Sequence, residues 1–394
     1  MKLTKSILIL FFVINITSAQ TKKEKYQFSA DINSKILKDT LSWKYQIGAT
    51  DYSISEYYKK ALETWDKNGN GIKKISKEDS LYFKTFKPQN AKEYIINRSK
   101  KEQVIIINEA HHNASHRVFT TSLLQGLYDN GYRYFGIEAL SDSLINKRKF
   151  PIMESGYYTM EPQMANLINE SEKIGFVLFE YETINKKNGK EREIEQAQNI
   201  AKIIEKNPNS KFLIHCGYEH VVEGTPGNKN WEKAMAGRLK EITGINPFTI
   251  DQVAYSEKGE AKFNSPYIEI VNSENPVIMT DHYEKTFNGG FQNDETDCRI
   301  IHPITRYSNE RPNWLLLNGK RKMYEIPKSK IKEYPVLILA YRSNEFEQNG
   351  VPADIIEITD TGKTGNLILD KGKYNIIVKD HNYKIIANYI KKIN

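Results

Sequence analysis

The feature that most constrains the fold is an alternation of short apolar runs with helical patterns between about Val104 and Tyr255. An apolar run at 104–108 is followed by a helical pattern at about 116–129 and then by a second apolar run at 133–137. Strands that alternate with helices of about 10 to 15 residues are typical of βαβ crossovers. The sequence therefore predicts an α/β fold built on a largely parallel sheet.

The remaining elements of this predicted core follow the same order. They are a helix at 163–173, a strand at 176–179, a helix at 191–205, a strand at 211–216, a helix at 231–242 and a strand at 248–253. The helix at 191–205 places Ile194, Ala197, Ala201 and Ile204 at helical spacing, which predicts one buried face. We expect the core domain to span residues 98–255.

From about residue 256 the sequence changes to short β-rich segments with turn residues between them. These segments are 267–271, 336–341, 354–358, 366–369, 374–378 and 383–387. Residues 373–379 alternate strictly between polar and apolar, as expected of a half-exposed antiparallel strand. We therefore predict a β-rich C-terminal region over 256–394, either packed on the core sheet or forming a small separate domain.

The first residues are typical of a secretory signal peptide. Lys2 and Lys5 precede an apolar run at 7–14, and small residues at 17–19 suit cleavage. The apolar run is too short to span a membrane, and no later segment is apolar for long enough. We expect a signal peptide over 1–19 and an exported protein, periplasmic or secreted, without a membrane span.

Residues 20–97 form a polar extension with one predicted helix at 55–65. The segment 66–71 imitates the start of a calcium-binding EF-hand loop, but Lys77 stands at the twelfth position, where a bidentate acid is required. A turn ahead of a helix that Ser76 begins is the preferred interpretation.

Charge and cysteine content exclude some classes of function. The chain has 57 Lys and Arg against 49 Asp and Glu, and the two signs are interleaved, so no basic patch indicates a nucleic-acid partner. Two cysteines, Cys216 and Cys298, allow either one disulfide or two free thiols. A core thiol is the preferred interpretation of Cys216.

Imidazole and carboxylate groups gather where predicted strands end. Five of the eight histidines fall in two short segments. The set is Glu109, His111, His112 and His116 after the first strand, Glu138 after the second, and His215 and His220 around a later strand end. Because carboxyl ends of parallel strands meet at one sheet edge, we expect these groups to converge.

Two chemistries suit such a set. The five histidines could hold zinc, iron or another metal, or one histidine could act as a general base oriented by a carboxylate. Arg192 opens a helix and could bind a substrate carboxylate or an oxyanion, although a solvated helix face explains it equally well. The loop at 222–230 is a plausible lid.

Four motifs in order resemble the erythromycin esterase/ChaN-like superfamily, and more distantly the TraB/Tiki group. They are EAHHNASH before a helix, GYRYFGIE, REIEQA and HCGYEH. Glu109 and His112 match the esterase-like pattern, with Asn108 in place of its glycine. Glu109, His111, Asn113 and His116 match the ChaN pattern, in which His111 and His116 would bind the cofactor. The resemblance covers about 104–252.

The resemblance implies a three-layer α/β domain with its pocket at the strand ends, and members that include ester hydrolases and haem binders. We expect an exported hydrolase of ester or related acyl bonds of a small-molecule substrate. His112 would activate water, Glu109 and Glu138 would orient it or balance charge, and His220 and Arg192 would face the oxyanion. The alternative is a haem- or metal-binding protein that uses the same histidines, and a third is a scaffold whose function lies in the β-rich end.

Overall fold

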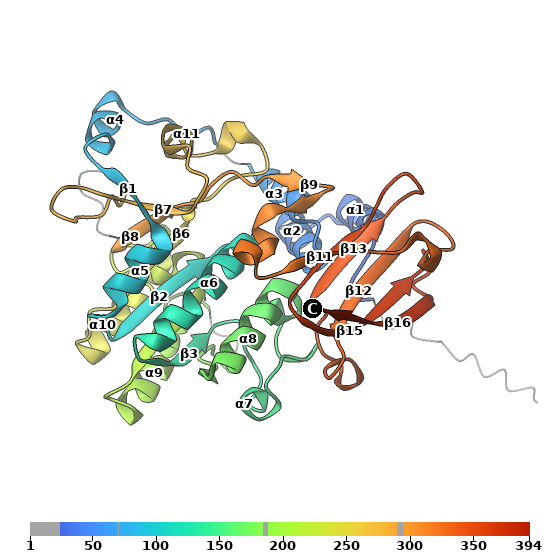
Figure 1. Ribbon diagram of the computed structural model, residues 1–394. Helices are drawn as coiled ribbons and strands as arrows, with labels where there is room; N and C mark the ends of the chain where they lie inside the picture. The colour runs from blue at the N-terminus through green and yellow to red at the C-terminus, as the bar shows by residue number, and fades with distance from the viewer. Residues whose placement is uncertain (1–23, 70, 184–187, 290–294) are drawn as a thin grey trace, which may run out of the picture.

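A sheet of eight strands forms the centre of the protein (Figure 1). Its strands are β1 (Lys87–Asn90), β2 (Val104–Glu109), β3 (Tyr132–Ile137), β4 (Val177–Phe179), β5 (Lys211–Gly217), β6 (Phe248–Tyr255), β7 (Val277–Thr280) and β8 (Cys298–Ile301). The computed structural model describes residues 24–69, 71–183, 188–289 and 295–394, so the predicted signal peptide at 1–19 lies outside the described residues.

The strand order is β1-β7-β8-β6-β2-β5-β3-β4. All neighbours from β8 to β4 are parallel, while β7 and β1 join one edge as antiparallel strands. The predicted largely parallel sheet is confirmed. Strands β1, β7 and β8 lie outside residues 98–255, so the sheet also recruits segments on both sides of that range.

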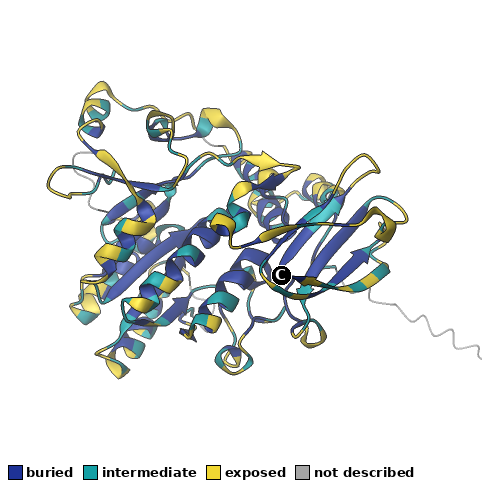
Figure 2. Ribbon diagram, viewed as in Figure 1, coloured by how far each residue is buried: buried dark blue, intermediate teal, exposed yellow. Residues whose placement is uncertain are grey.

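Helices cover both faces of the sheet, which gives three layers. One face packs against α5 (Ala91–Ser99), α6 (Ser115–Asp129) and α8 (Pro162–Ile174), and the other against α9 (Gly189–Lys206) and α10 (Met235–Thr243). Every residue of β2 is buried, because Ile105 and Ile107 face the first group of helices while Val104 and Ile106 face the second (Figure 2). A strand buried on both faces explains the continuous apolar run in the sequence.

The N-terminal extension contains more helix than the sequence predicted. Its helices are α1 (Ser29–Lys38), α2 (Lys44–Ile54), α3 (Tyr58–Asp66) and α4 (Lys77–Phe83). The predicted helix at 55–65 is α3, shifted by up to three residues. As predicted, Ser76 begins α4, and its hydroxyl accepts a hydrogen bond from the Asp79 main chain.

The C-terminal region is β-rich, as predicted. Its strands are β9 (Tyr307–Ser308), β10 (Arg311–Pro312), β11 (Lys322–Glu325), β12 (Val336–Arg342), β13 (Asp354–Ile358), β14 (Asn366–Leu369), β15 (Gly372–Lys379) and β16 (Ile385–Ile393). Four of them form an antiparallel sheet in the order β13-β12-β15-β16. Leu337 and Leu339 of this sheet pack against Tyr26 and Phe28, so the N-terminal segment ties the sheet to the rest of the molecule.

One predicted element was wrong, and one predicted helix begins later than expected. Residues 267–271 form helix α11 (Pro266–Val271) instead of a strand, because Pro266 occupies the first helical turn, where proline is well tolerated. The helix predicted at 231–242 begins only at Met235, since Glu232 has a φ of 60° that interrupts it. Helix α7 (Ile145–Arg148) was not predicted.

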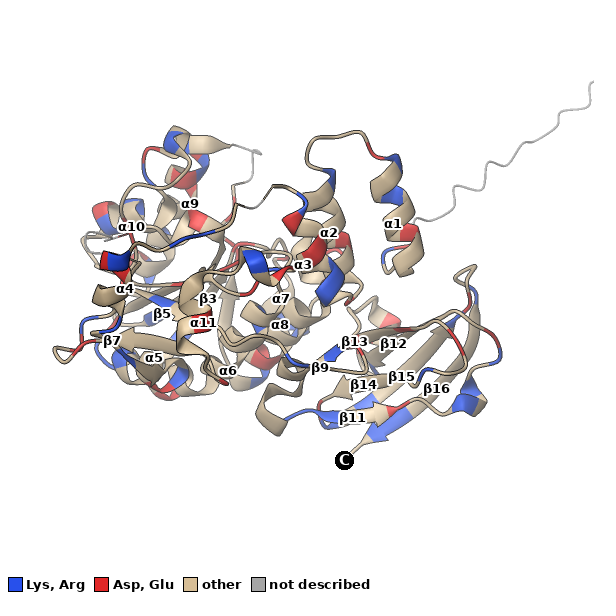
Figure 3. Cartoon of the chain, turned by 90° about the horizontal axis from the view of Figure 1, so that it is seen from above, with Lys and Arg blue, Asp and Glu red and all other residues tan. Residues whose placement is uncertain are grey.

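Both cysteines are buried free thiols, which settles the choice left open by the sequence. Among the described residues, no helix is both long and apolar enough to cross a bilayer. Lys and Arg residues alternate with Asp and Glu residues over the elements seen in Figure 3, in keeping with the interleaved charges of the sequence.

Candidate active site

Three adjacent parallel strands, β2, β5 and β3, end at the same edge of the central sheet. Glu109 is in register with Gly217, and Ile137 is in register with His215. Glu138 follows Ile137 directly. Glu109 and Glu138 therefore lie on opposite sides of the end of β5, in the position where open α/β sheets bind ligands.

Glu109 is held by a buried arginine. Nε and Nη2 of Arg117 donate to the two carboxylate oxygens of Glu109, both at 2.6 Å, and both side chains are almost fully buried. Burial alone would raise the pKa of Glu109, but Arg117 and the contact with His111 hold this pKa well below its usual range. Glu109 is therefore ionised at neutral pH, and it can only accept hydrogen bonds.

His111 is oriented by Glu109. Its Nδ1 lies 2.9 Å from Glu109 Oε1, and because the carboxylate can only accept, Nδ1 must carry the proton. In the neutral form of the ring, the lone pair is then on Nε2. The ring stacks on Tyr158 at a centroid distance of 3.9 Å. It also fills the space left by Gly217, where a Cβ would come within 2.6 Å of Nε2.

A second group of charges surrounds Glu138. One carboxylate oxygen of Glu138 accepts from Arg192, and the other accepts from the main-chain N–H of Gly217. Although burial would raise its pKa, His220 and Arg192 lower the pKa of Glu138 to about 2. Arg192 also donates to Glu182, so the arginine is shared between two carboxylates.

His220 lies between two carboxylates and an arginine. Its Nδ1 is 2.8 Å from Glu193 Oε2, and its Nε2 is 3.0 Å from Arg192 Nη1 and 3.5 Å from Glu138 Oε1. The ring stacks on Trp231 at 4.7 Å. Burial would lower the pKa of His220, but the carboxylates of Glu138 and Glu193 outweigh burial and raise it.

His215 of β5 lies next to Glu109. Its Nε2 is 3.7 Å from Glu109 Oε2 and has no hydrogen-bond partner among the described residues. Burial lowers its pKa to about 4, so the ring is neutral at physiological pH. Of the seven groups predicted to converge, five lie together: Glu109, His111, Glu138, His215 and His220. Arg192 joins them through its contacts with Glu138 and His220.

His112 faces a different side of this set. Its Nδ1 is 3.2 Å from the Tyr218 hydroxyl, and its ring stacks on Trp65 at 4.0 Å and 8° between planes. Burial lowers the pKa of His112 well below its usual value, and repulsion from Lys258 lowers it further. Tyr218 also contacts His111 edge-on at 5.1 Å, so it connects His112 to the base of the site.

The structure places His116 outside the site. Its Nδ1 accepts a hydrogen bond from the main-chain N–H of Ala110 at 3.0 Å, and its ring lies 5.3 Å from His302. Burial lowers its pKa strongly, and repulsion from His302 adds to this. His116 therefore fixes the turn that carries His111 and His112, and its Nδ1 is not free to bind a ligand.

The histidines do not fit the predicted metal site. In the described part of the chain, no group of three or more His, Cys, Asp or Glu side chains is placed to hold a metal ion. Both nitrogens of His116 contact neighbouring groups, and so do both nitrogens of His220.

A chain of buried polar groups extends from the site to the C-terminal sheet. Arg117 Nη1 donates to Glu161 at 2.8 Å, and the hydroxyl of Tyr58 contacts both Glu161, at 3.0 Å, and Glu56, at 2.7 Å. Glu56 in turn pairs with Arg311, which also donates to Asp354 of β13. The position of Glu109 is therefore tied to the N-terminal segment and to the C-terminal sheet.

Sequence reasoning missed several residues of the site. They are Trp65, Arg117, Tyr158, Glu161, Glu182 and Trp231. Arg117 had a detectable pattern, since it stands directly after His116 on the first turn of a helix that begins beside the strand end. Tyr158 and Trp65 come from separate segments, and nothing local in the sequence points to them.

Comparisons with known proteins give no family. No protein family matches the sequence, and no curated protein matches it. Two solved structures show a distant likeness. The RRSP effector domain of a MARTX toxin from Vibrio vulnificus CMCP6 is 12% identical over 54% of this chain, with a TM-score of 0.29. A structure described as "Bacterial protein toxins" is 13% identical over 51% of this chain, with a TM-score of 0.32. The aligned parts are 44% and 46% of those two chains, and at these TM-scores the likenesses establish neither fold nor function.

Proposed function

We propose that this protein is an exported hydrolase of an ester or related acyl bond, in which His111 activates water. The observation that carries the proposal is the pairing of His111 Nδ1 with the ionised carboxylate of Glu109 at 2.9 Å. This pairing fixes the tautomer that has a lone pair on Nε2, as a general base requires. The resemblance to the erythromycin esterase/ChaN-like superfamily supports the same reaction class.

The proposal places the base at His111, whereas the sequence analysis assigned water activation to His112. The ring of His112 lies flat against Trp65, and its Nδ1 contacts a tyrosine hydroxyl. Within the described parts of the chain, no carboxylate is hydrogen-bonded to it. The side chain of His111 is 16% exposed and can meet a substrate, while that of His215 is only 2% exposed. His112 acts instead as a positioning residue for Tyr218.

The reaction requires no covalent intermediate. A water molecule gives a proton to His111 Nε2, and its oxygen adds to the acyl carbon, while Glu109 stabilises the imidazolium that forms. The oxyanion receives hydrogen bonds from donors at the same edge. Arg192 remains cationic, and burial raises the pKa of Tyr158 to about 12, so its hydroxyl keeps its proton. When the tetrahedral intermediate collapses, His111 returns the proton to the leaving alkoxide.

A panel of esters, thioesters and lactones tests the proposal on purified protein. His111→Ala should lower kcat by about a hundredfold or more, which is the usual contribution of a general base. His112→Ala should have a smaller effect, because it removes a contact to Tyr218 and leaves the base in place. His381→Ala is the matched control, since His381 is exposed and remote in sequence.

Two results would contradict the proposal. One is a wild-type protein that hydrolyses no member of the panel, and the other is a His111→Ala variant with undiminished kcat. Metal content and visible absorbance of the same preparation test the alternative of haem or metal binding, which stays a prediction without a supporting observation among the described residues.

A further inference from the structure

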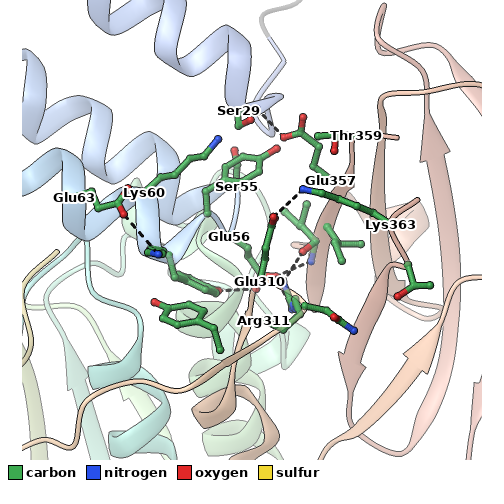
Figure 4. A pocket seen from close by; sticks show the side chains of 18 of the residues that line it. Ser29, Ser55, Glu56, Lys60, Glu63, Glu310, Arg311, Glu357, Thr359 and Lys363 are labelled. Atoms are coloured by element: carbon green, nitrogen blue, oxygen red, sulfur yellow. Dashed lines mark hydrogen bonds and ion pairs between the residues drawn. The ribbon is translucent and has the colours of Figure 1, made fainter. Parts of the chain in front are cut away.

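A cavity of about 670 Å³ lies between the N-terminal helices and the C-terminal sheet. Figure 4 shows side chains that line it. The start of α3 forms one wall, the β9–β10 hairpin a second, and the edge strand β13 a third. Its lining includes Tyr57, Lys60, Glu310, Glu357 and Lys363.

The main chain of β13 is only partly satisfied along this cavity. The N–H of Ile355 donates to Glu56 and its C=O accepts from Arg311, so both groups point away from the neighbouring strand β12. In an antiparallel pair this orientation repeats every second residue, so the N–H and C=O of Glu357 point the same way. No described residue makes a hydrogen bond to these two groups.

Glu56 and Arg311 therefore close the free edge of β13 at Ile355 and leave it open at Glu357. An open edge with paired donors and acceptors is a template for another strand. The antiparallel sheet has four strands, with β13 at its end. A fifth strand would continue the sheet into the cavity.

The cavity walls carry both signs of charge in equal number. Four acidic and four basic residues line it. Lys363 pairs with Glu310 across the opening at 2.8 Å, and Lys60 lies 5.6 Å from the ring centre of Tyr57. A strongly charged polymer of one sign would meet repulsion from half of these groups. A polypeptide with mixed side chains meets a partner of either sign.

We propose that this cavity binds an extended polypeptide segment, which adds to β13 as a further strand through the N–H and C=O of Glu357. The bound segment is of mixed charge, with main-chain amides supplying the affinity and side chains reaching the lysines and glutamates of the walls. Tyr58, Glu56 and Arg311 of the cavity wall belong to the buried polar chain that reaches Glu109. The proposal does not depend on the proposed function.

The test uses the purified full chain and an array of random hexapeptides immobilised on a membrane. Peptides that bind are resynthesised with N-methyl groups on alternate residues, which removes the main-chain donors and leaves the side chains unchanged. Binding should fall about tenfold or more for the methylated register that faces β13. The other register should bind as before.

Two protein variants complete the test. Glu357→Pro removes the main-chain donor, in an edge position where sheets tolerate proline, and it should weaken binding by about tenfold or more. Glu357→Gln keeps the donor, removes the same carboxylate, and should bind within a few-fold of the wild type. No bound peptide on the array, or binding that is insensitive to both methylation registers, would overturn the proposal even if Glu357→Pro failed to fold.

Discussion

Replacing Arg117 by methionine tests the electrostatic frame of the site. Arg117 is fully buried and donates to Glu109 twice at 2.6 Å and to Glu161 at 2.8 Å. Arg117→Met would leave two buried carboxylates without their cation. Removing one partner of a buried ion pair costs about 3–5 kcal/mol of unfolding free energy. We expect a loss in this range, because Glu109 retains its contact with His111 and Glu161 retains the N–H of Met164.

The loss of stability in Arg117→Met should depend on pH in a definite direction. In the wild type the pKa of Glu109 is depressed, so its contribution to stability is present at neutral pH and is lost as the pH falls through the folded-state pKa. Without Arg117, burial dominates and raises the pKa of Glu109. Protonation of Glu109 in acid then removes the unpaired buried charge that destabilises the variant. The stability gap between wild type and variant should therefore narrow from about pH 7 to about pH 5.

Urea unfolding followed by tryptophan fluorescence measures the gap, since Trp65 stacks on His112 within the site. Arg306→Met is the matched control, because Arg306 and its partner Glu274 are 72% and 73% exposed, and such pairs contribute about 0–1 kcal/mol. Combining Arg117→Met with Glu109→Gln and Glu161→Gln should recover much of the loss. A variant as stable as the control, or a gap that widens in acid, would refute the argument.

Two further predictions concern the site itself. Glu138→Gln should lower the pKa of His220, because the Glu138 carboxylate raises it. An NMR titration of the His220 ring protons measures this pKa, and an unchanged or higher value would contradict the prediction. Gly217→Ala should displace His111, because the new Cβ would lie 2.5 to 2.6 Å from the ring, and kcat should fall about tenfold or more while the unfolding midpoint changes little. The φ of Gly217 is −87°, so alanine adds no backbone strain, and full activity in this variant would contradict the placement of His111.

The sequence predicted the fold best where a strand is buried on both faces. Residues 104–108 and 211–216 were located within one residue, because continuous apolar patterns follow directly from burial on both faces. Strands β1, β7 and β8, of four residues each, were missed. Their place in the sheet depends on partners distant in the chain.

The candidate site was predicted in part. Residues at the strand ends converge because parallel strands share an edge, and this rule placed Glu109, Glu138 and His215 correctly. The rule says nothing about which way a histidine in the following turn points. His116 bonds to the main chain of Ala110, and His112 lies against Trp65, a residue of the N-terminal extension that the sequence alone gave no reason to place there.

The histidines of the site have environments that shift their pKa values in opposite directions. Burial lowers the pKa values of His112 and His215, and the carboxylate of Glu109 does not offset this effect. His220 is buried to a similar degree, yet the carboxylates of Glu138 and Glu193 raise its pKa. Burial therefore favours the neutral form of His112 and His215, while the carboxylates favour the charged form of His220. Gly217 and Glu138 lie between His111 and His220. This arrangement suits an acyl transfer in which Nε2 of His111 accepts the proton of water and the groups around His220 stabilise the negative charge of the oxyanion.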